Sequence, residues 1–239
     1  MDYPINLEGA GIDTSEFIRD YDEVAGRGFL QFEGVKAGEG LLLGNFSINS
    51  AKDRSGGHAL AALSTPDQSF GNMRVEHVKF STYGVNSWDS TVLLDGTQKT
   101  TGARGVRAVD FDDCLIFGAA GYSLVLKGVV GLRFDGGIYA AGGTNPQSGG
   151  AMVTGTPEVP SSGILLTGNA FGYLNLSHVV GMKVIAASGI AGQVIEGVQV
   201  AIDNDATADR IQIIAEPFGK VGHNWTHSSI ILPDGSILK

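Results

Sequence analysis

The chain has 239 residues and a net charge of −9, and it contains 36 Gly and a single Cys. An apolar content of 43% against 17% charged residues excludes a disordered chain, one cysteine excludes an intrachain disulfide scaffold, and the lack of a glycine triplet repeat excludes collagen. No apolar run reaches the roughly 18 residues of a membrane span, and the N-terminus lacks the basic and apolar regions of a signal peptide. An acidic chain without a basic run is a poor candidate for binding nucleic acid or anionic membranes, and we expect one glycine-rich domain over residues 1–239.

The first predicted element is a short helix or capping segment over residues 14–25, with Thr14 or Ser15 as its N-cap and Gly26 after its end. After it, the sequence consists of short runs of Val, Ile, Leu and Phe that are separated by Gly, Asn and Asp, a pattern typical of strands and turns. The predicted strands cover residues 40–48, 73–80, 92–94, 106–117, 124–139, 163–167, 172–185, 194–202 and 210–215.

Several of these runs repeat one layout: two apolar residues one apart, a polar residue, a turn-tolerant residue, and apolar residues again. The second apolar residue of each copy serves as an anchor, and the anchors are spaced by 36, 23, 42 and 37 residues. The anchors are Val75, Phe111, Phe134, Leu176 and Ile213.

The spacing of 23 residues fits one coil of a β-solenoid, in which each coil buries its inward side chains against the neighbouring coils. The longer spacings then require loop excursions, and residues 86–104 and 141–162 are rich in the Gly, Thr, Ser and Asn that such loops contain. A glycine-rich sandwich or jelly roll is the alternative, since it also has short strands.

The stretch from Val106 to Tyr139 resembles the right-handed parallel β-helices of the pectate-lyase-like superfamily. Its sequence is V-R-A-V-D-F-D-D-C-L-I-F-G-A-A-G-Y-S-L-V-L-K-G-V-V-G-L-R-F-D-G-G-I-Y. Within it, D-D-C-L-I resembles the N-C-x-I signature of a corner in that fold, with Asp113 where Asn is common, and the opening I-N-L-E-G-A-G-I-D-T resembles an early coil. Among the members, this acidic, cysteine-poor chain most resembles phage tailspikes and tail fibres. The resemblance implies an all-β, right-handed parallel β-helix that assembles as a homotrimer and binds, and in some members cleaves, bacterial surface polysaccharide.

If the anchors point inward, their neighbours point outward and form two files, because side chains alternate along a strand. One file alternates in charge, with Arg74, Asp110, Arg133 and Asn175. The other places like charges on successive rungs, with Glu76, Asp112, Asp135 and Ser177.

The like-charged file supplies the candidate catalytic residues Asp112, Glu76 and Asp135. Repulsion between neighbouring carboxylates favours one protonated acid beside an ionised one, which is what glycoside cleavage requires. Adjacent rungs, roughly 5 Å apart, match a retaining hydrolase, and alternate rungs, roughly 10 Å apart, lie near the inverting range. The alternative is a solvated acidic face or a set of turn-capping Asp residues.

For substrate binding we expect Trp88, which lies in a polar stretch without apolar periodicity, together with Tyr139, Arg74 and Arg133. The remaining aromatics that can stack on sugars or pack in the core or an interface are Tyr83, Tyr122, Tyr173 and Trp225.

Three further residue types receive structural interpretations. His77 and His178 occupy matching places in the repeat and are expected to be stacked corner residues. The H-N-W-T-H stretch lacks a third ligand, so no metal site is expected, and no cofactor is implied. Cys114 is interpreted as a buried, inert thiol.

These observations leave three hypotheses about function. The first is a tailspike-like receptor-binding protein of the phage tail that recognises lipopolysaccharide O-antigen or capsule, with another tail protein as a further partner and without membrane insertion. The second is a free, secreted enzyme of the same fold, a glycoside hydrolase rather than a lyase because no basic cluster accompanies the acids. The third is a non-catalytic fibre module.

Overall fold

The structure is a computed structural model that describes residues 5–34, 40–84, 88–99, 105–139, 150–168, 173–186, 199–202, 209–214, 229–231 and 235–238. Within these ranges every regular element is a strand, and no helix is long and apolar enough to cross a membrane. The all-β expectation is confirmed.

The strands form two sheets. The 11-stranded sheet, called the large sheet, contains β1 (Ile5–Glu8), β2 (Glu16–Arg19), β4 (Leu41–Ser50), β6 (Phe70–Thr82), β8 (Val106–Phe117), β10 (Val129–Tyr139), β12 (Ser161–Gly168), β14 (Val179–Ala186), β16 (Asp209–Ile214), β17 (Ser229–Ile231) and β18 (Ile237–Leu238). The seven-stranded sheet, called the small sheet, contains β3 (Gly28–Glu33), β5 (His58–Leu63), β7 (Ser90–Asp95), β9 (Leu124–Lys127), β11 (Gly150–Thr154), β13 (Tyr173–Leu176) and β15 (Gln199–Ile202).

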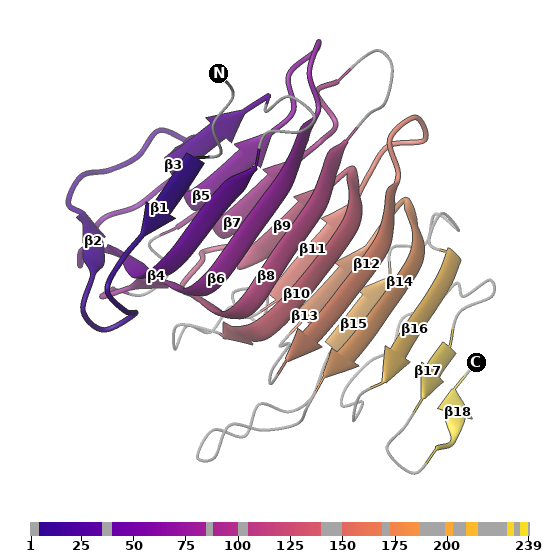
Figure 1. The fold of residues 1–239 in the computed structure, drawn as a ribbon. Helices are drawn as coiled ribbons and strands as arrows, with labels where there is room; N and C mark the ends of the chain where they lie inside the picture. The colour runs from indigo at the N-terminus through magenta and orange to yellow at the C-terminus, as the bar shows by residue number, and fades with distance from the viewer. Residues whose placement is uncertain are drawn as a thin grey trace.

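From β3 to β16 the chain alternates between the two sheets, so each coil contributes one strand to each (Figure 1). Neighbouring strands in both sheets pair in parallel, and only the final β17–β18 pair is antiparallel. This arrangement of stacked parallel coils is consistent with a β-solenoid.

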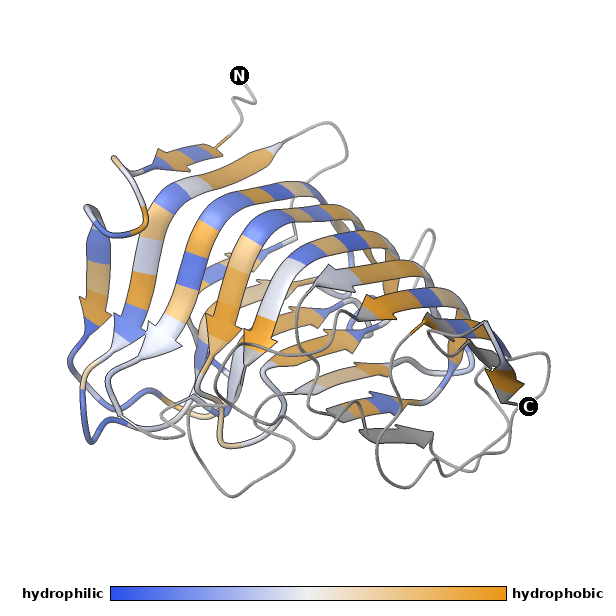
Figure 2. Ribbon diagram, turned by 90° about the horizontal axis from the view of Figure 1, so that it is seen from below, coloured by the Kyte–Doolittle hydropathy of each residue, from blue (hydrophilic) through white to orange (hydrophobic). Residues whose placement is uncertain are grey.

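The long strands of the large sheet curve around the core (Figure 2), and left-handed backbone positions in matching places mark the bend. Through the strand register, Asn72 of β6 stands opposite Ala108 of β8, and both have positive φ angles, 57° and 50°. The same file continues through Gly131, Gly163, Gly181 and Arg210. The same positive-φ conformation recurs on successive rungs from β6 to β16, which lets these coils change direction at one point without breaking the ladder.

The predicted internal file is confirmed for its first three anchors. Val75 pairs with Phe111, Phe111 pairs with Phe134, and all three side chains are fully buried. The two phenylalanine rings lie 5.5 Å apart, so the file packs ring on ring as well as strand on strand.

Leu176 is not part of this file. It lies in β13 of the small sheet, where it pairs with Val153, and the file instead continues from Phe134 through Leu166 and Val184 to Ile213. The prediction for Leu176 failed for two reasons. The coils differ in length, and the small-sheet segment L-N-L alternates apolar and polar residues in the same way as the large-sheet strands.

Two further expectations need correction. The predicted helix over residues 14–25 is wrong: Phe17 of β2 pairs with Ile48 of β4 and packs edge-on against the Phe46 ring at 5.3 Å, so strand pairing overrides the local helical pattern. The segments 86–104 and 141–162 are not simple excursions, since they contain β7, β11 and the start of β12.

Candidate functional site

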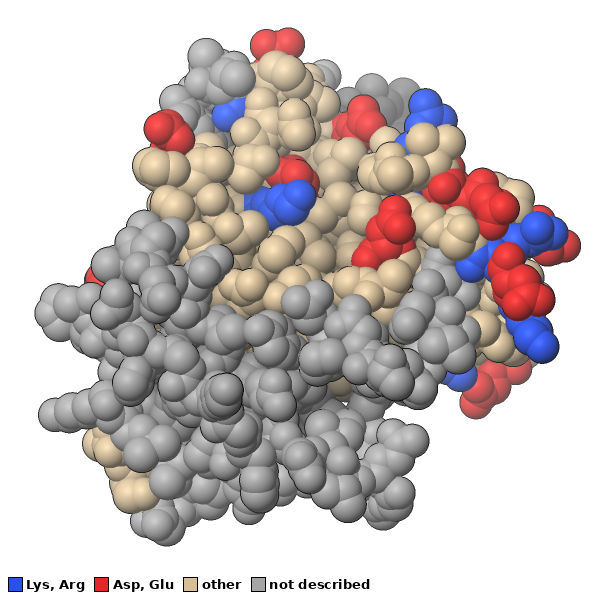
Figure 3. Space-filling model, turned by 180° about the vertical axis from the view of Figure 1, so that it is seen from behind, with Lys and Arg blue, Asp and Glu red and all other residues tan. Residues whose placement is uncertain are grey.

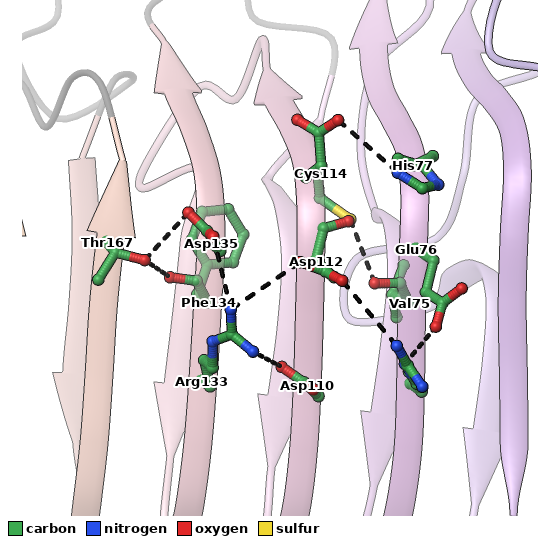
Figure 4. A network of polar contacts seen from close by, with 12 residues as sticks. Val75, Glu76, His77, Asp110, Asp112, Cys114, Arg133, Phe134, Asp135 and Thr167 are labelled. Atoms are coloured by element: carbon green, nitrogen blue, oxygen red, sulfur yellow. Dashed lines mark hydrogen bonds and ion pairs between the residues drawn. The ribbon is translucent and has the colours of Figure 1, made fainter.

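The charged residues predicted to be catalytic lie on the outer face of the large sheet, where β6, β8 and β10 bring them together (Figure 4). Glu76 stands directly opposite Asp112 in the register. At this point β8 has a bulge, in which Asp112 and Asp113 stand opposite the single residue Asp135 of β10. Asp135 therefore lies beside Asp112 out of strict register.

Two arginines lie between these carboxylates. Arg74 forms an ion pair with Glu76 and lies 3.9 Å from Asp112. Arg133 lies 3.6 Å from Asp135 and 4.0 Å from Asp112, and it also reaches Asp110 at 4.0 Å. We call these residues, Arg74, Glu76, Asp110, Asp112, Arg133 and Asp135, the ion-pair network.

The network compensates the repulsion that the sequence indicated. Each of its carboxylates has an arginine within 4.0 Å, and the Thr167 hydroxyl also donates a hydrogen bond to Asp135 at 3.1 Å. The side chains are between about a quarter and six-tenths exposed, so each pair contributes no more than about 1 kcal/mol. The geometry is that of a solvated ladder of alternating charge.

The corner histidines do not stack on each other. His77 and Asp113 occupy one corner file, both with positive φ angles, and the His77 Nε2 atom lies 3.8 Å from the Asp113 carboxylate. His178 lies between β13 and β14, where its Nδ1 atom is 3.0 Å from the Ser177 hydroxyl. The apparent match came from the misplaced Leu176 copy of the repeat.

Trp88 is not available to stack on a sugar. Its side chain is 0% exposed, its indole N–H donates to the Ser81 carbonyl at 2.9 Å, and the Arg19 guanidinium covers its ring. The side chains of Tyr139 and Tyr173, like Trp225, lie outside the described residues. Tyr83 is exposed, and its hydroxyl bonds Glu16.

A second candidate site lies on the outer face of the small sheet, where a groove of about 500 Å³ crosses β5, β7, β9 and β11. Its floor is apolar: Leu93 pairs with Val125, which pairs with Met152, and these side chains form an outer cluster with Ala61, separate from the main core. Leu93 and Val125 are 7% and 6% exposed, and Met152 is half-buried. Figure 3 shows the side of the molecule that lies behind the large sheet in Figure 1, and most of its described surface is uncharged. The residues that line the groove are Gly26, His58, Leu63, Asp89, Ser90, Leu93, Asp95, Gln98, Gly121, Tyr122, Val125, Lys127 and Met152.

Polar groups stand at both ends of this floor. At the start of β7, the buried His58 ring places Nδ1 2.8 Å from the Ser90 hydroxyl and 3.1 Å from the Ser90 carbonyl oxygen. Burial lowers the pKa of His58, while the Ser90 carbonyl and Asp89 oppose that shift, so the ring is neutral at pH 7. At the end of β7, Asp95 lies 3.8 Å from the Lys127 ammonium.

The groove also offers one aromatic side wall. Tyr122 packs against the apolar floor with its ring, and its hydroxyl accepts a hydrogen bond from Asn175 at 3.0 Å. A ring held in this way presents a fixed apolar face beside hydrogen-bonding groups, which is the combination that sugar recognition uses.

The described residues that line the groove do not include two carboxylates at glycosidase spacing. Asp89 and Asp95 are six residues apart along one strand, which separates their Cα atoms by about 20 Å, whereas hydrolysis requires carboxyl groups roughly 5–9.5 Å apart. In the described part of the chain, no three His, Cys, Asp or Glu side chains gather as a metal site.

Only part of this groove could be predicted from the sequence. Tyr122 was among the aromatic candidates, but Leu93 and Val125 belong to runs that are apolar on both faces and look like ordinary core strands, and Met152 lies in a segment predicted to be a loop excursion.

Comparison with known proteins adds no relative. No family model, no curated protein and no solved structure matches this chain.

Proposed function

We propose that this protein is a receptor-binding module of the phage tailspike or tail-fibre kind, which binds a bacterial cell-surface polysaccharide, O-antigen or capsule, in the groove over the small sheet. The observation that carries the proposal is the groove's composition: an apolar floor across three strands, a tyrosine beside it and polar groups at both ends. Sugar rings have apolar faces and hydroxyl edges, so a linear glycan can lie on such a floor and bond to its ends.

The proposal includes a right-handed coil, a homotrimer and attachment to another tail protein in the virion. Right-handed winding is supported by the general preference of crossover connections between parallel strands. A trimer would cover exposed strand edges and side faces that a lone coil stack leaves open to aggregation.

A second candidate function is glycoside hydrolysis by the ion-pair network. The observation in its favour is that Asp112 lies between Glu76 and Asp135 on adjacent strands. Release of reducing sugar from a bound polysaccharide, abolished by Asp112→Asn, would support it. A purely structural fibre module is the outcome if no polysaccharide is bound or cleaved.

The test is binding to a panel of purified bacterial O-antigens and capsular polysaccharides, with Tyr122→Ala as the groove variant. Tyr83→Ala is the matched control, because Tyr83 is an exposed tyrosine that does not line the groove. We expect Tyr122→Ala to weaken binding about tenfold or more and Tyr83→Ala to leave it unchanged. Wild-type affinity in a correctly folded Tyr122→Ala protein would contradict the proposed site.

A further inference from the structure

The charged groups of the groove are unevenly balanced. Among the residues that line it, Asp95 and Lys127 face each other at 3.8 Å and so largely cancel, and His58 is buried and neutral. Asp89, at the other end, is the remaining charge.

Asp89 is held with its carboxylate at the groove wall. One of its oxygens, Oδ2, accepts a hydrogen bond from the Gly57 backbone N–H at 2.8 Å, and its own N–H donates to the Gly57 carbonyl, also at 2.8 Å. This pair of bonds fixes the residue between β5 and β7 while its side chain stays exposed to solvent.

The surroundings of Asp89 do not neutralise this end. Arg19 interacts electrostatically with Asp89, but Glu23 and Asp22 act on it more strongly. Arg19 is itself fully buried against Trp88 and donates to Ser50, so its guanidinium does not reach the groove. Among the described residues that line this end of the groove, Asp89 is the one charged side chain.

We propose that the groove accepts an uncharged polysaccharide and that Asp89 determines this specificity by excluding acidic glycans such as polyuronates. The inference rests on the proposed function, and it names the class of sugar that the same site takes. A carboxylate on the glycan would lie next to the fixed charge of Asp89, and among the described lining residues the one cation, Lys127, is already paired with Asp95. The chain's net charge of −9 adds a long-range repulsion of the same sign.

Three proteins are compared: the wild type, Asp89→Asn and Asp13→Asn. Asparagine keeps an oxygen that can accept the Gly57 N–H and removes the charge. Asp13 lies in an exposed turn between β1 and β2, outside the groove, so Asp13→Asn changes the net charge equally without touching the site.

The probes are purified neutral O-antigens and acidic capsular polysaccharides, each acidic polymer being paired with its carboxyl-reduced form, in which the same backbone carries no charge. At low ionic strength we expect the wild type to bind reduced forms at least about tenfold more tightly than the acidic parents. In Asp89→Asn the preference for the reduced form over its acidic parent should fall to about threefold or less. In Asp13→Asn this preference should equal that of the wild type.

The outcomes separate the two proposals. If no polysaccharide binds the wild type, the proposed function and this inference both fail. If polysaccharides bind in the groove but the wild type holds acidic polymers as tightly as their reduced forms, the function stands and the inference is overturned. If Asp89→Asn keeps the wild-type ratio of affinities for reduced and acidic polymers, Asp89 does not determine the specificity.

Discussion

The guanidinium carbon of Arg19 lies 3.9 Å from the centre of the Trp88 ring, and both side chains are fully buried. Arg19 belongs to β2 at the N-terminal end of the stack, and Trp88 precedes β7 in the small sheet. The arginine also donates to the Ser50 hydroxyl at 2.7 Å and to the Gly56 carbonyl. Burial lowers the pKa of Arg19, against the opposing effect of Glu23 and other acids, and the cation–π contact helps to compensate that burial. The contact between Arg19 and Trp88 thus connects β2 to the end of the groove at the start of β7.

Trp88→Ala should therefore destabilise the fold strongly. The substitution removes a large buried ring, the hydrogen bond to Ser81 and the partner of a buried cation. We expect a loss of about 3–5 kcal/mol in the free energy of unfolding, measured by urea denaturation. Tyr83→Ala, at an exposed aromatic, should cost about 1 kcal/mol or less. A cost for Trp88→Ala no larger than that of the control would show that the indole is not buried.

Two glycines of β10 should respond very differently to alanine. At Gly136 an added Cβ would meet the Cys114 carbonyl oxygen at 1.9 Å, whereas at Gly131 it would meet nothing within 4 Å. Both have positive φ, so Gly131→Ala pays only the backbone strain of about 1–2 kcal/mol. Gly136→Ala must also push two coils apart, and we expect at least about 3 kcal/mol in chemical denaturation. Equal costs would contradict the close approach of β10 to β8.

Stability should fall in mild acid because of His58. Burial lowers its folded-state pKa below the ordinary value of about 6.5, so the unfolded chain binds more protons between the two pKa values. The stabilisation from a neutral His58 is complete above the unfolded-state pKa and is lost as the pH falls toward the folded-state pKa.

The measurement is the free energy of unfolding from pH 7.5 to pH 5, compared between the wild type and His58→Gln. The wild-type slope should be steeper by up to about 1.4 kcal/mol per pH unit. Parallel curves for the wild type and His58→Gln would disprove the assignment.

Arg133→Ala should lower the stability of the folded protein more than Arg74→Ala does, because Arg133 lies within 4.0 Å of three carboxylates and Arg74 of two. We expect about 1 kcal/mol or less for each exposed pair that is lost, and a difference between the variants that shrinks in 1 M salt. Thermal unfolding at two salt concentrations measures it. A difference that does not respond to salt would mean that packing, and not charge, explains it.

The stacking of the coils could be predicted from the sequence where successive coils share the same alternation of apolar and polar residues. Val75, Phe111 and Phe134 could be aligned because each is followed by a polar residue and a turn-tolerant corner. Leu176 was misplaced because a small-sheet strand showed the same alternation, and coil lengths that vary from rung to rung gave no fixed period to correct it.

The groove was harder to predict for a physical reason. Its floor residues come from three strands. β7 and β9 are apolar on both faces, so the alternation that marks an outer surface is missing there, and β11 lies in a segment that was predicted to be a loop excursion. Trp88 was placed at the surface because its neighbours in sequence are polar, but its burial depends on Arg19, 69 residues earlier in the chain.

The most direct test of the account is a crystal structure of the protein with an oligosaccharide cut from the polysaccharide that it binds most tightly. We predict sugar rings in the groove across β7, β9 and β11, with one ring beside Tyr122. Sugar bound instead on the opposite face, over Arg133 and Asp112, would contradict the groove as the site of recognition.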